Sequence, residues 1–461
     1  FQKKEKKKMI TKPKGCYDIV DKEAVKFKIM NRAIEYFCEF YNYDYIRTPI
    51  FESRDLFHRT VGSDTDIVTK ETYDFKDRSD RELTLRPEGT AGVVRSFIEN
   101  KMYGTGLPKK FYYNGTMYRY ERPGNGRNRE FTQFGVEILG SNDPMTDAEV
   151  ISMPYRLFEE LGFKDLNVKI NNLGAKSDRE NYKNALKEYL KPYIDDLCED
   201  CKVRFETNPL RILDCKVDGD SEILKNVPSI LDYQSEESEK RFKKVLEYLT
   251  YLDVDYEVDD KIVRGLDYYD YTVFEIVSNA EVLGGASTIA AGGRYNDLVE
   301  KLGGPSTPCM GFASGLERLS LAMEEMNMQE KRPLDAYILY VNEEEKLKAL
   351  MLAQDLRISG ISADYDTTGR SLKSQFKEAD RNKARMLILL NSEDLQKGLI
   401  TVKKKQKLMK MKSLITWFQI YKEDKNGLKR FMEEYRRVQK QRSRNTWLDQ
   451  KSPSTKRFWF Y

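Results

Sequence analysis

The sequence has no apolar run near the roughly 20 residues that a membrane-spanning helix needs, so no membrane protein is expected. The first eight residues are mostly lysine and no apolar segment follows them, which argues against a secretory signal peptide. Only one histidine and six scattered cysteines occur in 461 residues. Such sparse cysteine suits a reducing compartment better than a disulfide scaffold, so a cytoplasmic location is expected.

The formal net charge of +4 hides two segments of opposite sign. Residues 403–461 contain 18 Lys and Arg against 5 Asp and Glu, a net charge of +13, whereas residues 1–402 have a net charge of −9. A nucleic-acid partner therefore cannot be argued from overall charge, and only local basic patches would indicate one. The length allows two or three domains.

The most informative stretch is YRYERPGNGRNREFTQFGVE, residues 118–137. Two strands are predicted here, because side chains alternate along a strand and the central Pro-Gly-Asn-Gly segment is typical of a turn. One face would carry Arg119 and Glu121 from the first strand and Gln133 and Glu137 from the second. This face suits a ligand with both a phosphate and an amine, although a solvated surface hairpin would have the same pattern.

Earlier segments predict elements that precede this hairpin. Helical spacing of apolar residues predicts a helix over 25–41, and a strand follows over 45–52, where Pro49 suggests an edge position. A second strand from Leu83 ends in a turn that leaves Glu88 and Thr90 near a helix start.

From about residue 163 to 255 the chain changes to charged helical segments with few glycines, which indicates an inserted helical module. Glycine-rich segments then return, reading RGLDYY at 264–269, AAGGRY at 290–295 and GFASGLERL at 311–319. The expected organisation is a lysine-rich leader (1–8), a main domain (9–328) with a helical insertion at about 175–255, a small domain (334–402) and a basic tail (403–461).

The small domain is predicted from alternating strands and helices, which indicate an α/β unit with a mixed, largely parallel sheet. After Val402 no strand or helix period is sustained, so we expect a disordered extension or a reading-frame artefact. The strands are expected at 336–341, near 362, and at 386–390 and 399–402, with helices at 344–358 and 371–383.

Together these segments resemble the class II aminoacyl-tRNA synthetases. The Pro49 segment, the arginine-bearing hairpin and the GLERL helix look like the three ordered motifs of that class. RGLDYY followed by AGGRY is a much narrower signal and resembles the two histidine-specific motifs of the histidyl-tRNA synthetase family, and LTLRPEGT and REFTQFGVE also match this family. The resemblance covers roughly residues 9–402. It implies an α+β fold: a class II synthetase-like antiparallel sheet with a helical insertion, followed by a small domain like an anticodon-binding domain.

The resemblance also implies roles for residues at matching positions. Arg119 would hold the α-phosphate of ATP and Arg318 the γ-phosphate, since a guanidinium binds phosphate bidentately. Arg264 would face the α-phosphate opposite Arg119, and these two arginines would be catalytic. Further expected contacts are Glu121 with ATP; Glu88, Gly89, Thr90 and Gln133 around the substrate α-amino group; and Glu137, Tyr269 and Tyr268 around the imidazole.

The expected partners are L-histidine, ATP with Mg²⁺, tRNA(His) and a second copy of the chain. Contacts with tRNA are expected from Arg122 and Arg127 and from a stripe of basic residues, Lys373, Lys377 and Arg381, at four-residue spacing on one helix face. Such a stripe is commonly only solvated, and the resemblance of its domain to an anticodon-binding domain favours RNA.

The family resemblance implies the activity of a histidine–tRNA ligase, and two other interpretations compete with it. One is a non-catalytic paralogue that acts as a regulatory subunit in histidine biosynthesis, and such proteins tend to lose the arginines and the C-terminal domain. The other is a plain RNA-binding protein, which leaves Glu88, Gln133 and Glu137 unexplained.

A zinc site at Cys198, Cys201 and Cys215 is a weak prediction. A structural zinc site needs four ligands, and neither a fourth cysteine nor the single histidine, His58, lies nearby in sequence. No metal ligands are therefore assigned.

Overall fold

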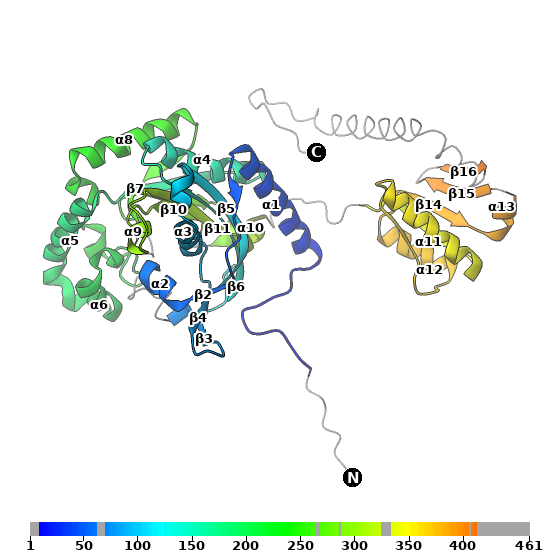
Figure 1. Ribbon diagram of the computed structural model, residues 1–461, viewed down its shortest axis with the longest axis horizontal. Coiled ribbons are helices and arrows are strands. Elements are labelled where there is room, and N and C mark those ends of the chain that lie inside the picture. The colour runs from blue at the N-terminus through cyan, green and yellow to red at the C-terminus, as the bar shows by residue number, and fades with distance from the viewer. Residues whose placement is uncertain are drawn as a thin grey trace, which may run out of the picture. The chain divides into compact units, whose positions relative to one another are not determined.

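The computed structural model describes residues 9–61, 70–124, 126–263, 268–284, 287–323, 333–397, 399–404 and 407–412. The lysine-rich leader, Arg264 and residues 413–461 lie outside these ranges. The chain forms two compact units, which divide between residues 330 and 331 (Figure 1).

The first unit is built on an eight-stranded sheet in the order β1-β5-β6-β11-β10-β9-β7-β8. Its six central strands pair antiparallel, and the two edge strands pair parallel with their neighbours. The predicted antiparallel sheet is confirmed. The strands are β1 (Asp44–Tyr45), β5 (Lys109–Tyr118), β6 (Glu130–Leu139), β7 (Leu166–Asn172), β8 (Tyr256–Val258), β9 (Asp270–Ser278), β10 (Thr288–Arg294) and β11 (Cys309–Gly315).

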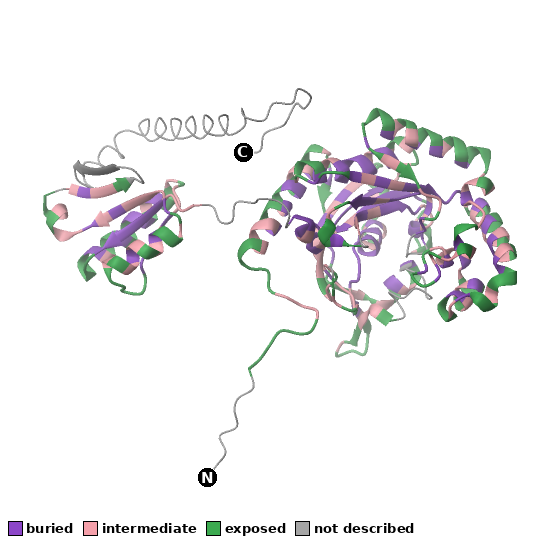
Figure 2. Ribbon diagram, turned by 180° about the vertical axis from the view of Figure 1, so that it is seen from behind, coloured by how far each residue is buried: buried purple, intermediate pink, exposed green. Residues whose placement is uncertain are grey.

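The two faces of this sheet differ because side chains alternate along each strand. In β6, Phe134 and Val136 point into the main apolar core, while Gln133 and Glu137 point to the opposite face. Figure 2 shows the buried strands inside a shell of helices with exposed outer surfaces. The core face is covered by α1 (Asp21–Phe40), α4 (Pro144–Glu160), α8 (Glu236–Tyr251) and α10 (Leu316–Ala322).

On the opposite face α3 (Thr90–Glu99) packs a second apolar cluster against β5. The buried polar side chains of Gln133 and Glu137 lie on this face as well. A small antiparallel sheet in the order β2-β4-β3 precedes α3 in the chain. The remaining elements of this region are β2 (Phe51–Ser53), α2 (Arg54–Val61), β3 (Tyr73–Lys76), β4 (Glu82–Leu85), α9 (Leu298–Lys301) and short 3₁₀ helices at Met102–Thr105 and Glu281–Leu283.

Two strand predictions are wrong in part. The strand expected over 45–52 is interrupted between β1 and β2, because Pro49 has no N–H group and the carbonyl of Thr48 accepts a hydrogen bond from Arg86 Nη1 (3.0 Å). The first hairpin strand was expected to include Arg119 and Glu121, but β5 ends at Tyr118.

The helical insertion has its own apolar core, to which Tyr182, Leu186, Phe205 and Ile212 contribute. In contrast, α8 packs on α4 and contributes to the core of the main sheet. The insertion contains α5 (Lys176–Leu190), α6 (Glu199–Thr207), α7 (Glu222–Lys225) and 3₁₀ helices at Lys191–Asp196, Pro209–Ile212 and Ile230–Tyr233.

The second unit has a five-stranded mixed sheet in the order β13-β12-β14-β15-β16. Two strand pairs are parallel and two antiparallel, so the mixed sheet is confirmed. The expectation of no strand after Val402 is wrong, because β16 pairs antiparallel with β15 despite its lysines. The elements are β12 (Ala336–Tyr340), α11 (Glu343–Ile358), β13 (Ala363–Tyr365), α12 (Leu372–Arg381), β14 (Met386–Leu390), α13 (Ser392–Gln396), β15 (Leu399–Lys404) and β16 (Lys407–Lys412).

A buried ion pair ties α4 to the central sheet. Arg294, at the end of β10, donates from Nε to Asp147 Oδ1 (2.6 Å), and both side chains are fully buried. Asp147 also accepts hydrogen bonds from Thr272 (2.7 Å) and from Arg241 of α8 (3.1 Å). One carboxylate thus connects two strands and two helices.

Replacing Asp147 by Ala should therefore destabilise the first unit by about 3–5 kcal/mol, because the buried guanidinium of Arg294 loses its counter-charge. The measurement is urea unfolding followed by circular dichroism, since all three tryptophans lie beyond residue 412. Glu239→Ala removes an exposed pair with Lys243 and serves as the control. Equal unfolding midpoints for the two variants would contradict this role for Asp147.

Candidate active site

Two adjacent cavities open on the polar face of the main sheet. The smaller has a volume of about 170 Å³ and the larger about 430 Å³. Arg119 and Gln133 line both, so the cavities adjoin. The smaller is also lined by Glu88, Thr90, Glu137, Tyr268, Tyr269 and Tyr295, and the larger by Glu71, Glu121, Arg127, Arg211, Glu317 and Arg318.

Glu88 is fixed at the start of α3. Its carboxylate accepts hydrogen bonds from the backbone N–H groups of Thr90 (2.6 Å) and Ala91 (2.8 Å). Burial nevertheless raises the pKa of Glu88 above its ordinary value, and these two hydrogen bonds act against that rise. The neighbouring Gly89 donates its N–H to Gln133 Oε1 (3.1 Å), which fixes the amide of Gln133 beside Glu88.

Glu137 lies at the floor of the smaller cavity. Thr90 Oγ1 donates to one carboxylate oxygen (2.6 Å), and the Tyr295 hydroxyl donates to the other. Burial raises the pKa of Glu137 to about 8, while these two hydrogen bonds lower it and the nearby Glu88 raises it further. Glu137 is therefore a carboxyl group that a hydrogen-bond donor or a cation bound beside it would ionise.

Gly311 on β11 makes room for this carboxyl group. A Cβ atom at Gly311 would lie 1.9 Å from Glu137 Oε2, so any side chain there would displace Glu137. Gly311 pairs with Glu137 across the two strands, so this close approach explains the glycine at the start of the GFASG segment.

Three tyrosine rings form the wall beside Glu137. Tyr268 packs on Tyr269 with ring centroids 4.6 Å apart and meets Tyr295 edge-on at 5.6 Å. Tyr268 and Tyr295 are buried, whereas Tyr269 is half-buried. Tyr295 was not among the site residues expected from the sequence, although the AGGRY motif contains it.

The larger cavity is rich in arginine. Arg119 donates from Nε to the carbonyl of Pro87 (2.9 Å), and Arg318 donates from Nη1 to the carbonyl of Thr288 (2.8 Å). Burial lowers the pKa of Arg318, and the charge of the neighbouring Arg127 lowers it further. Positive groups that disfavour one another in a half-buried cavity indicate an anionic ligand.

Carboxylates alternate with these arginines. Glu121 lies 3.8 Å from both Arg119 Nη1 and Arg127 Nη1. Glu317 Oε1 accepts the backbone N–H of Thr132 (2.7 Å), and burial raises the pKa of Glu317 to about 7. Carboxylate oxygens are the kind of ligand that suits Mg²⁺, so the residues of this cavity fit such an ion.

Most residues singled out from the sequence therefore meet at these cavities, even though they come from four separate segments. Among those of the first unit the exceptions are Arg264, which lies outside the described residues, the exposed Arg122 and the buried Gly89, neither of which lines a cavity. Arg211 of the helical insertion lines the larger cavity and was not anticipated, because no motif marked it.

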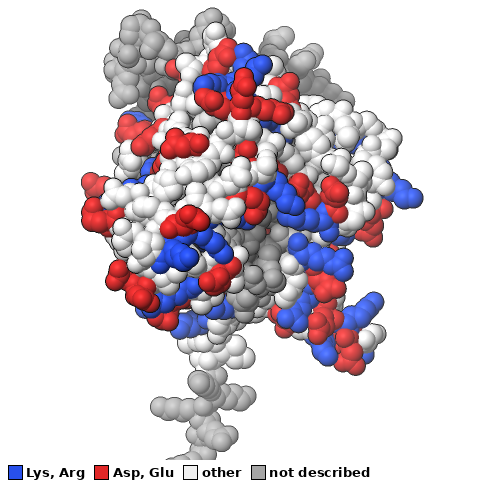
Figure 3. Space-filling model, turned by 90° about the vertical axis from the view of Figure 1, so that its left-hand side faces the viewer, with Lys and Arg blue, Asp and Glu red and all other residues white. Residues whose placement is uncertain are grey.

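In the second unit α12 presents its basic stripe to solvent. Lys373, Lys377 and Arg381 are exposed, while Ala379 is buried and Phe376 partly so. Arg381 also contacts Glu378 at 2.9 Å. Figure 3 shows a face of the first unit instead, where Lys and Arg side chains lie among Asp and Glu side chains and form no single basic surface.

Comparison with known proteins now gives the family. A family model described as histidyl-tRNA synthetase matches residues 15–319, and an anticodon binding domain model matches residues 335–419. The chain belongs to the histidyl-tRNA synthetase family. The family resemblance drawn from the motifs is confirmed. The second match also runs past residue 402, in agreement with the position of β16.

Curated relatives in the family are similar over nearly their whole length. The histidine–tRNA ligase of Listeria innocua is 49% identical over 84% of this chain and 92% of its own, and that of Bacillus subtilis is 47% identical over 86% and 94%. A solved structure of apo S. aureus histidyl-tRNA synthetase has a TM-score of 0.75 at 39% identity, covering 88% of this chain and 97% of its own.

A structure titled as an ATP phosphoribosyltransferase regulatory subunit/histidyl-tRNA synthetase from Bacillus halodurans shares the fold. It has a TM-score of 0.58 at 22% identity over 80% of this chain and 96% of its own. In the part of the chain that the structure describes, no helix is long and apolar enough to cross a membrane.

The raised pKa of Glu137 predicts a pH-dependent stability of this family member without ligand. Between the ordinary value of 4.5 and about 8, the folded chain keeps a proton that the unfolded chain has lost, so stability falls as pH rises. Glu137→Gln removes this dependence. The free energy of unfolding of the variant minus that of the wild type should therefore increase with pH across that window, by at most about 1.4 kcal/mol per pH unit.

Urea unfolding at several pH values without histidine measures this difference. Glu300→Gln, an exposed carboxylate, is the matched control and should follow the wild-type profile. A constant difference between the wild type and Glu137→Gln would contradict a buried, protonated Glu137.

Proposed function

We propose that this protein is a histidine–tRNA ligase. In the first step the carboxylate of histidine attacks the α-phosphorus of ATP, pyrophosphate leaves, and histidyl-adenylate forms. In the second step a ribose hydroxyl at the 3′ end of tRNA(His) takes the histidyl group and AMP is released. The observation that carries the proposal is the buried Glu137 in a small cavity that adjoins an arginine-lined one.

The smaller cavity is proposed to bind histidine. Glu137 would accept the N–H of the imidazole, with Tyr268 and Tyr269 against the ring. Glu88 and the amide of Gln133 would accept hydrogen bonds from the α-amino group, with Gly89 and Thr90 holding them in place. An analogue without ring nitrogens would not supply the N–H that Glu137 would accept from the imidazole, which gives selectivity without editing.

The larger cavity is proposed to bind ATP. Arg119, which lines both cavities, would hold the α-phosphate where the histidine carboxylate attacks, and Arg318 would hold the γ-phosphate. Donors aimed at the phosphoryl oxygens stabilise the charge that builds up in the transition state. Mg²⁺, near Glu121, would supply further positive charge. The family resemblance adds Arg264 as a second catalytic arginine at the α-phosphate.

Contacts with tRNA are proposed at Arg122 and Arg127 near the active site and at the basic stripe of α12. A homodimer is also proposed. Ile50, Phe51 and Phe75 are exposed on or beside the small sheet, where apolar side chains suit a subunit interface.

A regulatory subunit is not favoured. The relatives that are 47–50% identical are named histidine–tRNA ligases, whereas the structure whose title includes a regulatory subunit is only 22% identical. The two described arginines at the phosphate positions, Arg119 and Arg318, are present here.

Histidine-dependent exchange between ATP and pyrophosphate tests this proposal directly. The wild type should catalyse the exchange, and Arg119→Ala should lower its rate by at least about 10²-fold, the usual loss for one donor to a developing anion. Arg32→Ala, an exposed arginine on α1, is the control. No exchange in the wild type would favour the regulatory paralogue.

Glu137→Gln should weaken histidine binding by roughly 1.5–3 kcal/mol, because it keeps the shape of the side chain but removes the charge that the imidazole meets. Calorimetric titration with histidine measures the change, and ATP binding to the same variant serves as the internal control. Unchanged histidine affinity would assign imidazole recognition to other groups.

A further inference from the structure

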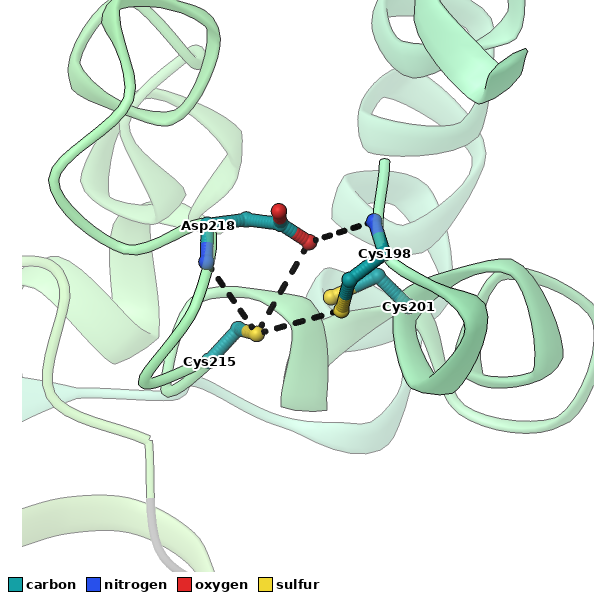
Figure 4. Close-up of side chains that lie close together, drawn as sticks. All are labelled: Cys198, Cys201, Cys215 and Asp218. Carbon is teal, nitrogen blue, oxygen red and sulfur yellow. Dashed lines mark hydrogen bonds between the residues drawn. The ribbon is translucent and has the colours of Figure 1, made fainter. Parts of the chain in front are cut away.

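Four potential metal ligands converge in the helical insertion (Figure 4). Cys198 and Cys201 lie at the start of α6, and Cys215 and Asp218 lie in the turn that follows the 3₁₀ helix at Pro209–Ile212. One sulfur or oxygen atom from each lies within 4.8 Å of all the others. The Sγ atoms of Cys198 and Cys215 are 3.7 Å apart, and the cysteines are not disulfide-bonded.

Asp218 adds a buried charged group to the three cysteines of this cluster. It is buried, and no described Lys or Arg forms a salt bridge with it. Its Oδ2 accepts the backbone N–H of Cys198 (3.0 Å) and lies 3.7 Å from Cys215 Sγ. Because a buried carboxylate without a counter-charge is costly, a cation among these four groups would stabilise the insertion.

The backbone around the sulfurs also favours thiolates. The N–H groups of Val217 and Asp218 both point to Cys215 Sγ at 3.4 Å. Cys198 and Cys201 lie at the N-terminus of the nine-residue helix α6, where the helix dipole stabilises negative charge. Cysteines that served only as apolar core residues would need neither the N–H groups directed at Sγ nor a position at a helix N-terminus.

We propose that Cys198, Cys201, Cys215 and Asp218 form a structural zinc site. A tetrahedral Zn²⁺ with Zn–S bonds of about 2.3 Å separates its sulfur ligands by about 3.8 Å, close to the 3.7 Å between Cys198 and Cys215. Three thiolates exclude Mg²⁺ and Ca²⁺, which prefer oxygen ligands. The mutual distances suit a single ion, and no ligand position remains open for a catalytic water.

This site was only a weak prediction from the sequence, because no fourth cysteine or histidine lies near the three cysteines in the chain. The fourth ligand is an aspartate three residues after Cys215, and only the turn brings its carboxylate back to the sulfurs. A backbone hydrogen bond from Gly219 N to Cys215 O (2.8 Å) closes this turn. A Cβ at Gly219 would lie 2.4 Å from that carbonyl oxygen, so the turn requires glycine.

The ion would connect α6 to the loop that carries Arg211 into the larger cavity. Arg211 lies between ligands Cys201 and Cys215 in the chain, and its carbonyl accepts a hydrogen bond from Arg204 of α6 (3.3 Å). The zinc site would thus fix the insertion at the edge of the active site without taking part in the chemistry.

Metal analysis of the full-length protein, purified without chelator, tests the proposal. We expect about one zinc ion per chain in the wild type and in the control Cys16→Ser, and loss of zinc to background in Cys215→Ser and Cys201→Ser. Cobalt substitution of the wild type should give the intense visible absorption of tetrahedral thiolate coordination. Hydrogen exchange over residues 198–219 should become faster when zinc is removed.

A second measurement covers variants that do not fold. Titration of the wild-type thiols with a mercurial reagent should release the zinc into a chromogenic indicator. Background zinc in the wild type after growth in zinc-supplemented medium would overturn the proposal. A Cys198–Cys215 disulfide in non-reduced peptide maps would overturn it as well.

Discussion

The buried carboxyl group of Glu137, which has no salt bridge with any described Lys or Arg, is the constraint on which the polar side of the sheet depends. Thr90 at the start of α3 and Tyr295 after β10 each donate to one of its oxygens, so three distant segments must meet at this point. Gly311 must lack a side chain for the carboxyl group to fit. Burial disfavours the ionised form of Glu137, which raises its pKa. A ligand that donates a hydrogen bond to the carboxylate would favour the ionised form again.

The opposite face of the same sheet provides the stability that this arrangement requires. Phe134 and Val136 alternate with the polar residues of β6 and join the largest apolar core, and the Asp147–Arg294 ion pair connects α4 to the sheet. A rigid sheet with one packed face can hold poorly compensated charges on the other without losing its shape. Because side chains alternate between the two faces of a strand, neighbouring residues of β6 contribute to the apolar core on one face and to the cavities on the other.

Charged residues form small local groups in this protein, and the net charge of the chain does not reflect them. The net charge of +4 describes neither the arginine-lined cavity nor the basic stripe of α12, because each is compensated by acidic groups elsewhere. Within the larger cavity Glu121 lies 3.8 Å from two arginines, so positive charge is concentrated in the cavity and partly balanced there without a basic surface around it. The helical insertion contains a local group of the opposite kind, in which the Asp218 carboxylate and three cysteine thiols lie within 4.8 Å of one another.

The sequence by itself determined the family, the antiparallel sheet and the alternation that puts Gln133 and Glu137 on one face, because these follow from motifs and from a period of two residues. It also indicated the small mixed α/β domain. Tertiary structure alone decided that the strand over 45–52 is interrupted, because the partner of the Thr48 carbonyl is the distant Arg86. It alone showed that lysine-rich residues 407–412 form an edge strand, since pairing with β15 outweighs their composition. Likewise Tyr295, Arg211 and Asp218 acquire significance only from neighbours far away along the chain, and no local pattern records such contacts.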